Sequence, residues 1–351
     1  MVRHFLTLND VEDKELVEII DKGIEMKKNP GKYSTAMKDK TLLMIFAKPS
    51  LRTRVSFEVG MTKMGGHGIF YDIANSPMGK KESIGDTART ASRYVDVVMA
   101  RLFEHRDIEE YAANSSVPVI NALTNFSHPC QITADLMTIK EKKGDFKTLN
   151  LTYLGDSNNN VTHSLMYGCA KVGMNITVGC PEGKEFSPHE NVVKESMEIA
   201  KKNGSEVKVV NNPSKAIKDA NVVYTDSWMS YHIKPEEMEE RKKILMPYRV
   251  NEELVKGAKK NYIFMNCLPA MRGMEQTAEV IDGSNSIVFD QAENRLHAQN
   301  AIILFLLNKL RVNGNSGNIL LKVDIGSFFS CFSIGCIDKP LFSRNIKYSS
   351  I

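Results

Sequence analysis

Residues 41–54 read TLLMIFAKPSLRTR and join the two elements that decide the fold. The first seven residues form an apolar run, which predicts a buried strand. A polar turn follows, and then Val55, Val59 and Met64 fall on one face of a predicted helix. A buried strand, a polar turn and a helix in this order are typical of an α/β protein with a parallel sheet.

The same alternation continues along the chain. Apolar runs at 95–100 and 117–120 predict two more strands, and residues 132–146 predict a helix that ends in a charged turn. The pattern then restarts and predicts a helix from 161 and strands at 149–154, 175–178, 206–210, 222–225, 262–265 and 286–289. We therefore expect two parallel-sheet α/β domains with the active site in the cleft between them.

The expected domain bounds follow from where the pattern restarts. Residues 1–145 would form the first domain and residues 146–295 the second. The helical stretch 296–311 would pack back onto the first domain. Residues 312–351 include FFSCFSIGC and show little periodicity, so we expect an irregular C-terminal extension there.

Composition narrows the classes of function. The 351 residues are 42% hydrophobic and 25% charged, with a formal net charge of only +4. Basic residues are mixed with acidic ones, so no footprint of nucleic-acid binding is present. The longest apolar run, 301–307, is far shorter than the ~20 residues of a membrane span. The six cysteines form no CxxC pair, which favours reduced thiols in a cytoplasmic protein.

Ser50, Arg52 and Thr53 stand between the first predicted strand and its helix, where an anion could bind. Free backbone amides at a helix N-terminus favour an anion. Two hydroxyl groups and a bidentate guanidinium would complete a phosphate site. This segment alone fits equally well a capping serine followed by solvent-exposed arginines, because short motifs often match by chance.

Other cations and hydrogen-bonding groups follow other predicted elements. Arg101 comes directly after a strand, His128 and Gln131 lie in a loop before a helix, and Arg295 stands in DQAENR, which is expected to end the strand at 286–289. Each of these residues alone is more typical of a structural role. Because ligands bind at the carboxyl ends of parallel strands, the set as a whole indicates a site for a phosphate and a polarised carbonyl.

The second half places polar groups of another kind after its strands. Asn160 lies in GDSNNN, Asp226 and Ser230 lie in DSWMS, and Cys267 and Leu268 follow YIFMN. Amide, hydroxyl and carboxylate groups suit a zwitterionic amino acid, whose ammonium could meet Asp226. Asn-rich turns are also common where no ligand binds. HExxH, nucleophile-elbow and P-loop motifs are absent, so we expect neither a metal nor a cofactor.

These segments, in this order, resemble the aspartate/ornithine carbamoyltransferase family over nearly all of residues 1–311. The markers are KPSLRTRVSFE, ESIGDTAR, FSHPCQ, GDSNNN, YTDSW, NCLPA and FDQAENR. FSHPCQITADLMTIKE and AENRLH are similar to the ornithine branch of the family. The resemblance implies a transferase that moves the carbamoyl group of carbamoyl phosphate onto the side-chain amine of ornithine. It also implies a homotrimer, or a multiple of trimers, with active sites at subunit interfaces.

The resemblance gives each matching residue a role. Carbamoyl phosphate would be bound by Ser50, Leu51, Arg52, Thr53, Arg101, His128, Gln131 and Arg295. Ornithine would be bound by Asn160, Asp226, Ser230, Tyr231, Cys267 and Leu268. The catalytic groups would be Arg52, Arg101, His128, Asp226, Cys267 and Arg295. Their cations would stabilise the charge that grows in the transition state.

Four positions depart from the family's pattern. Leu51 replaces a usual threonine, and Asn266 replaces a usual histidine. Pro77 stands where a glutamine or histidine often reaches the site of the neighbouring subunit. The usual Ser-Met-Gly reads Ser-Tyr-His at 230–232, in a loop that is one residue longer.

The altered loop leaves two other functions open. Putrescine carbamoyltransferases have a similarly lengthened loop, and CLPAMRG followed by EVIDG is similar to theirs, whereas Ser230 favours ornithine. The third possibility is a catalytically inactive paralogue that acts as a binding or assembly protein. Its expected sign is the loss of charge-stabilising residues, but the chain retains Arg52, Arg101, His128 and Arg295.

Overall fold

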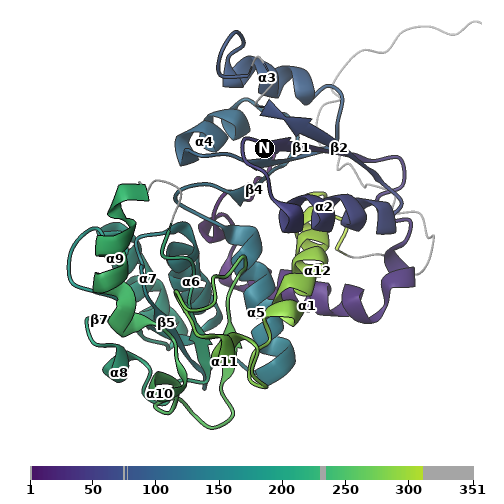
Figure 1. Ribbon diagram of the computed structural model, residues 1–351. Helices are drawn as coiled ribbons and strands as arrows, with labels where there is room; N and C mark the ends of the chain where they lie inside the picture. Colours follow the sequence, from purple (N-terminus) through teal and green to yellow (C-terminus); the bar gives the residue numbers. More distant parts are fainter. Residues whose placement is uncertain (1, 74–75, 77, 230–234, 311–351) are drawn as a thin grey trace, which may run out of the picture. The chain divides into compact units, whose positions relative to one another are not determined.

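The structure is a computed structural model that describes residues 2–73, 76, 78–229 and 235–310. Within these ranges the strands form a four-stranded sheet and a five-stranded sheet, in which every strand pair is parallel (Figure 1). Helices connect the strands. The expected architecture of two parallel-sheet α/β domains is confirmed.

The first sheet has the strand order β2-β1-β3-β4. Its strands are β1 (Thr41–Phe46), β2 (His67–Asp72), β3 (Val97–Arg101) and β4 (Val119–Leu123). The helices of this half are α1 (Asp13–Lys28), α2 (Leu51–Lys63), α3 (Ile84–Ala91), α4 (His105–Ala113) and α5 (Pro129–Lys143). Strands β3 and β4 are buried along their whole length, as expected for a sheet that helices cover on both faces.

Strand β2 was not predicted from the sequence. It lies at the edge of the first sheet, where its residues are exposed or half-buried. Because no face of this strand is fully buried, its sequence HGIFYD lacks the continuous apolar run by which β1 was recognised.

The second sheet has the order β7-β6-β5-β8-β9. Its strands are β5 (Asn150–Leu154), β6 (Asn175–Gly179), β7 (Val207–Val210), β8 (Val222–Tyr224) and β9 (Ile263–Met265). The helices of this half are α6 (Asn160–Val172), α7 (Glu190–Asn203), α8 (Pro213–Ala216), α9 (Met238–Leu245), α10 (Glu252–Val255) and α11 (Ala278–Ile281). Strand β5 is central and pairs with β6 and β8.

The strand predicted at 286–289 is wrong. Ser286 makes only an isolated bridge to Phe264, and helix α12 (Val288–Leu306) begins two residues later. The segment DQAENR is therefore helical and not a loop at the end of a strand. A short apolar run such as SIVF does not by itself distinguish a strand from a buried helix, which explains the error.

Helix α12 packs against α1, α2 and α5, and these helices lie side by side in Figure 1. Its middle is fully buried through Ala298, Ala301, Ile302 and Ile303. The helix also contacts β9 of the second sheet. It therefore joins elements of both halves beside the ends of their strands.

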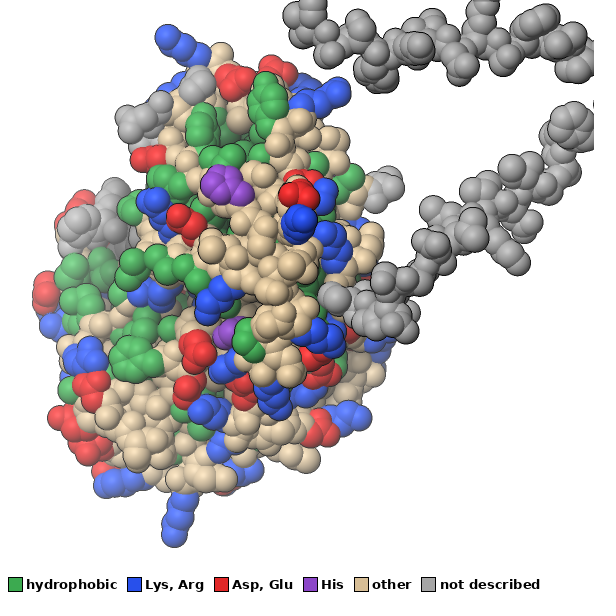
Figure 2. Space-filling view, turned by 90° about the vertical axis from the view of Figure 1, so that its right-hand side faces the viewer, with side chains coloured by type: hydrophobic (Ala, Val, Ile, Leu, Met, Phe, Trp, Pro, Cys, Tyr) green, Lys and Arg blue, Asp and Glu red, His purple; other side chains and the backbone are tan. Residues whose placement is uncertain are grey.

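The surface and the helices add two facts. On the face displayed in Figure 2, lysine and arginine side chains are intermixed with aspartate and glutamate. Of the described helices, none has both the length and the apolar character that crossing a membrane requires. The extension expected at 312–351 lies outside the described residues.

Candidate active site

A cavity of about 770 Å³ lies at the carboxyl ends of strands from both sheets. Its walls come from the loops after β1, β3, β4, β5, β8 and β9, and from α12. The predicted site residues that line it are Ser50, Leu51, Arg52, Thr53, Arg101, His128, Gln131, Asn160, Asp226, Cys267, Leu268 and Arg295. Ser230, Tyr231 and Pro77 lie outside the described residues. The structure thus brings together every predicted site residue that it describes.

The N-terminus of α2 forms one wall of the cavity. Ser50 caps this helix: its Oγ accepts the backbone N–H of Thr53 at 3.3 Å and donates to Thr53 Oγ1 at 3.0 Å. Arg52 is half-buried in the first turn, whereas Leu51 is 75% exposed. The capping interpretation and the anion-site interpretation are therefore compatible, because the cap itself faces the cavity.

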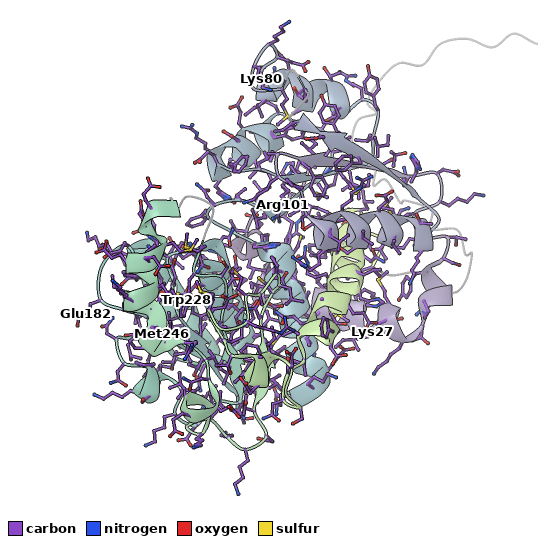
Figure 3. All side chains as sticks on the ribbon, viewed as in Figure 1. Lys27, Lys80, Arg101, Glu182, Trp228 and Met246 are labelled. Carbon is purple, nitrogen blue, oxygen red and sulfur yellow. The ribbon has the colours of Figure 1, made fainter. Side chains whose placement is uncertain are left out.

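Arg101 ends β3 at an irregularity of the sheet. The register between β3 and β4 shifts between Ala100 and Arg101, and such a bulge redirects a side chain. Arg101 is 5% exposed and lies between the two halves in Figure 3. Its buried guanidinium therefore reaches the cavity from the first sheet.

Sequence reasoning missed Lys48, which also lines this wall. Its Nζ lies 5.7 Å from the centre of the Phe103 ring. Burial lowers the pKa of Lys48 to about 7, and the positive charge of Arg101 contributes to this shift. The available signal was its position at the carboxyl end of β1, two residues before Ser50.

His128 is the residue directly before α5, at its N-cap position, and is buried. Its backbone N–H donates to Ser164 Oγ at 2.9 Å, which fixes the loop on α6. Burial holds the pKa of His128 well below its usual value, and the charges of Arg295 and Arg101 act in the same direction. The ring is therefore neutral near pH 7. Its Nδ1 is buried and has no hydrogen-bond partner among the described residues, while the residue as a whole lines the cavity.

Arg295 reaches the cavity from α12 and is 2% exposed. Its Nη1 donates to Gln131 Oε1 at 2.6 Å and its Nε to Gln299 Oε1 at 2.9 Å. Within the described ranges its hydrogen-bond partners are all neutral, namely Gln299, Gln131 and Thr53, and no carboxylate accepts a hydrogen bond from it. A buried cation that no carboxylate contacts directly is unfavourable, even though Asp135 lies beyond Gln131, so this side of the cavity favours an anion.

The loops after β8 and β9 form a wall of the cavity that carries a carboxylate and a thiol. Cys267 Sγ donates to Asp226 Oδ1 at 3.2 Å. Burial raises the pKa of the Cys267 thiol well above its usual value, so the thiol keeps its proton. Burial also raises the pKa of Asp226, while hydrogen bonds from Ser227 and Cys267 oppose the shift. This wall can accept the positive or polar end of an amine.

The remaining groups of the acceptor wall come from turns. Asn160 is the first residue of α6, and its Nδ2 donates to Thr124 O at 2.5 Å. Leu268 has a positive φ of 56°, and its N–H donates to Asn266 Oδ1 at 2.8 Å. Asn266 is fully buried and does not line the cavity, so it shapes the turn from behind.

The fold and the site together define an enzyme that binds an anionic substrate, which gives up a group, next to an amine that receives the group. One wall holds cations and a neutral imidazole, and the other holds a carboxylate and a protonated thiol. Among the described residues, no group of three or more His, Cys, Asp or Glu side chains could hold a metal ion. The chemistry that the described residues offer is binding, orientation and electrostatic stabilisation.

Comparison with known proteins gives this class a family. The carbamoyl-P binding domain of the aspartate/ornithine carbamoyltransferases matches residues 3–141, and their Asp/Orn binding domain matches residues 147–306. The chain therefore belongs to the aspartate/ornithine carbamoyltransferase family. The resemblance inferred from its motifs is confirmed, and so is the expected class of enzyme, a carbamoyltransferase.

Individual relatives are similar over most of their length. The chain is 50% identical over 313 residues to the ornithine carbamoyltransferase of Thermococcus kodakarensis, which covers 88% of this chain and 98% of that one. The solved structure of the Pyrococcus furiosus ornithine carbamoyltransferase is 48% identical, with a TM-score of 0.82 over 86% of this chain and 96% of that one. The Giardia lamblia ornithine transcarbamoylase is 45% identical, with a TM-score of 0.81 over 88% and 98%.

Proposed function

We propose that this protein is an ornithine carbamoyltransferase, which converts carbamoyl phosphate and L-ornithine into L-citrulline and phosphate. The observation that carries the proposal is one cavity lined both by the guanidinium of Arg295, which no described carboxylate contacts directly, and by the Asp226–Cys267 pair. The names of the similar proteins support ornithine as the acceptor.

Carbamoyl phosphate would bind to the cationic wall. Ser50, Thr53 and the amides at the start of α2 would hold the phosphate together with Arg52 and Arg101. The neutral imidazole of His128 and the amide of Gln131 would orient the carbamoyl group. Arg295 would stabilise the negative charge that develops on its oxygen.

The transfer would proceed by direct attack of the amine. The neutral side-chain amine of ornithine forms a C–N bond to the carbamoyl carbon, the C–O bond to phosphate breaks, and phosphate leaves with the bonding electrons. A free alkyl ammonium has a pKa near ~10, so the amine must lose one proton before attack and a second afterwards. Asp226 and Cys267 would orient the amine, and holding both substrates in one cavity supplies the proximity effect.

The acceptor is tested by phosphate release from carbamoyl phosphate with ornithine, putrescine or aspartate. We expect kcat/KM to be highest with ornithine, because the amide of Asn160 suits a substrate with an α-carboxylate. A preference for putrescine would overturn the proposed acceptor and make the chain a putrescine carbamoyltransferase instead. The absence of turnover with all three amines would favour an inactive paralogue.

We further propose a cytoplasmic homotrimer, with residues 1–145 as the carbamoyl-phosphate-binding domain and 146–295 as the ornithine-binding domain. An exposed apolar surface on α2 and β2 supports assembly: Leu51, Val55, Val59, Ile69 and Phe70 are 75%, 47%, 36%, 41% and 37% exposed. We expect sedimentation equilibrium to give three times the 39.4 kDa of one chain, or a multiple of that mass. A monomer would contradict this assembly.

A further inference from the structure

Asp135 is a fully buried carboxylate outside the cavity, and the transfer described above does not use it. It lies on α5, one turn after Gln131. Its Oδ1 accepts Gln131 Nε2 at 2.8 Å and Gln291 Nε2 at 2.8 Å, and its Oδ2 accepts the hydroxyl of Tyr224 at 2.9 Å. Three donors from α5, α12 and β8 therefore converge on one carboxylate.

The contact with Gln131 determines how the groups that would bind carbamoyl phosphate are oriented. An ionised carboxylate only accepts hydrogen bonds, so Gln131 must turn its amide nitrogen toward Asp135. Its Oε1 then points the other way and accepts Arg295 Nη1 at 2.6 Å. If the amide of Gln131 were reversed, its N–H groups would face the N–H groups of the guanidinium. Asp135 thus fixes the orientation of Gln131 and, through it, the direction of the Arg295 side chain.

In the same way, the contact with Gln291 determines how the turn on the acceptor wall is oriented. Gln291 also turns its amide nitrogen toward Asp135 and toward the Tyr224 hydroxyl, which is 3.1 Å away. Its Oε1 then accepts the backbone N–H of Asn266 at 3.0 Å. Asn266 in turn holds the Leu268 N–H that shapes the Cys267–Leu268 turn. Tyr224 ends β8, two residues before Asp226.

Burial disfavours the ionised form of Asp135, whereas its hydrogen bonds and the nearby positive charge favour it. Burial raises the pKa of Asp135 to about 6, while the hydrogen bonds from Gln131, Gln291 and Tyr224 and the charge of Arg295 oppose the shift. The group is therefore largely ionised at neutral pH. A buried carboxylate is tolerated when its lone pairs are occupied, and here all of its donors are neutral groups of fixed direction.

We propose that Asp135 is a positioning residue for carbamoyl transfer, which acts through Gln131 on Arg295 and through Gln291 on the Cys267–Leu268 turn. It would fix the distance and orientation between the cationic wall, which would bind carbamoyl phosphate, and the acceptor wall, so that the amine meets the carbamoyl carbon at the correct distance. This inference rests on the proposed function of the same cavity. Small misplacements of reacting groups reduce turnover strongly, which gives such a residue its importance.

The test compares Asp135→Asn and Tyr224→Phe with the wild-type enzyme. Asp135→Asn removes the charge and places an N–H group opposite either the Tyr224 hydroxyl, which would lose its acceptor, or the glutamine amides, which donate. We expect kcat to fall on the order of 10- to 100-fold, with each KM changed less than about 3-fold. Tyr224→Phe removes one donor and should lower kcat on the order of 10-fold. Because both changes act on one network, the double variant should lose no more than Asp135→Asn alone.

Thr138→Val is the matched control. Thr138 Oγ1 accepts Asn294 Nδ2 at 2.8 Å, so this pair joins the same two helices about one turn farther along and does not line the cavity. We expect Thr138→Val to keep the wild-type kcat even where its melting temperature falls. An equal loss of kcat in this control would show that general packing of α5 and α12 is responsible, and the positioning role would be rejected.

Two further outcomes separate this inference from the proposed function. If Asp135→Asn does not fold, Tyr224→Phe still tests the positioning role, because it deletes a single hydroxyl and leaves the ring in place. A kcat within about 2-fold of wild type in folded Tyr224→Phe would overturn the role, since placement effects are expected to be larger. A wrong acceptor would show in the wild-type enzyme itself, and the kcat ratios would then be measured with the amine that it uses.

Discussion

Replacing Arg52 with alanine should lower kcat/KM for carbamoyl phosphate roughly 100- to 1,000-fold, the range found when one preorganised charge-stabilising donor is removed. Arg52 lies in the first turn of α2 and lines the cavity, where it would meet the phosphate beside the amides of the helix. It is half-buried and is not part of the hydrophobic core. The variant should therefore fold normally and lose activity through the missing charge alone.

Thermal unfolding with and without carbamoyl phosphate checks the cause. The ligand should raise the melting temperature of the wild-type protein, because binding to the native state stabilises it, and Arg52→Ala should lose this shift. Lys63→Ala removes one positive charge from the exposed far end of the same helix and should keep both the shift and the activity. If Arg52→Ala kept the full shift, the phosphate would have to bind elsewhere in the cavity.

The parts of this site that the sequence predicted are those that local chain geometry determines. Ser50, Arg52 and Thr53 stand at a strand-to-helix turn, and a polar turn after a buried strand is recognisable from a few neighbouring residues. His128 and Asp226 likewise follow strands within a short distance. Because the carboxyl ends of parallel strands meet at one edge of a sheet, these residues could be expected to lie together.

The parts that the sequence did not predict depend on packing between distant segments. Arg295 was expected in a loop after a strand, but it reaches the cavity from a helix that packs against α2 and α5. Asp135 has the sequence pattern of an ordinary polar position on a helix. Its partners Tyr224 and Gln291 lie 89 and 156 residues away along the chain, so no local pattern could reveal that it is buried and hydrogen-bonded.

Replacing Arg241 with methionine should lower the free energy of unfolding by about 3–5 kcal/mol, the usual effect of breaking a buried ion pair from one side. Arg241 Nη2 lies 2.5 Å from Asp156 Oδ2, and the two side chains are only 9% and 1% exposed. The guanidinium also lies over the Phe186 ring, 4.7 Å from its centre. Methionine could keep much of this packing, but it would leave the Asp156 carboxylate buried without its cation. Urea unfolding measures the loss.

The dependence on pH identifies the unpaired carboxylate as the cause. Burial already raises the pKa of Asp156 to about 7 in the native state, and the charge of Arg241 opposes this shift. Without Arg241 the native state would keep the Asp156 proton to still higher pH, whereas the unfolded chain releases it near ~3.9. The native state then binds more protons than the unfolded state, so its stability falls as pH rises. The deficit of Arg241→Met should therefore be larger at pH 8 than at pH 6.

Two variants separate this explanation from a general loss of an arginine. Adding Asp156→Asn to Arg241→Met should restore part of the stability and remove the extra pH dependence, because a neutral amide replaces the unpaired charge. Arg272→Met breaks an exposed pair in which Nε and Nη2 lie 2.7 Å and 2.6 Å from the two carboxylate oxygens of Asp282. Its geometry is as good as that of the buried pair, but solvent screens it, so its loss should be much smaller. Equal losses for the two arginines would mean that burial is not what makes the Asp156–Arg241 pair important.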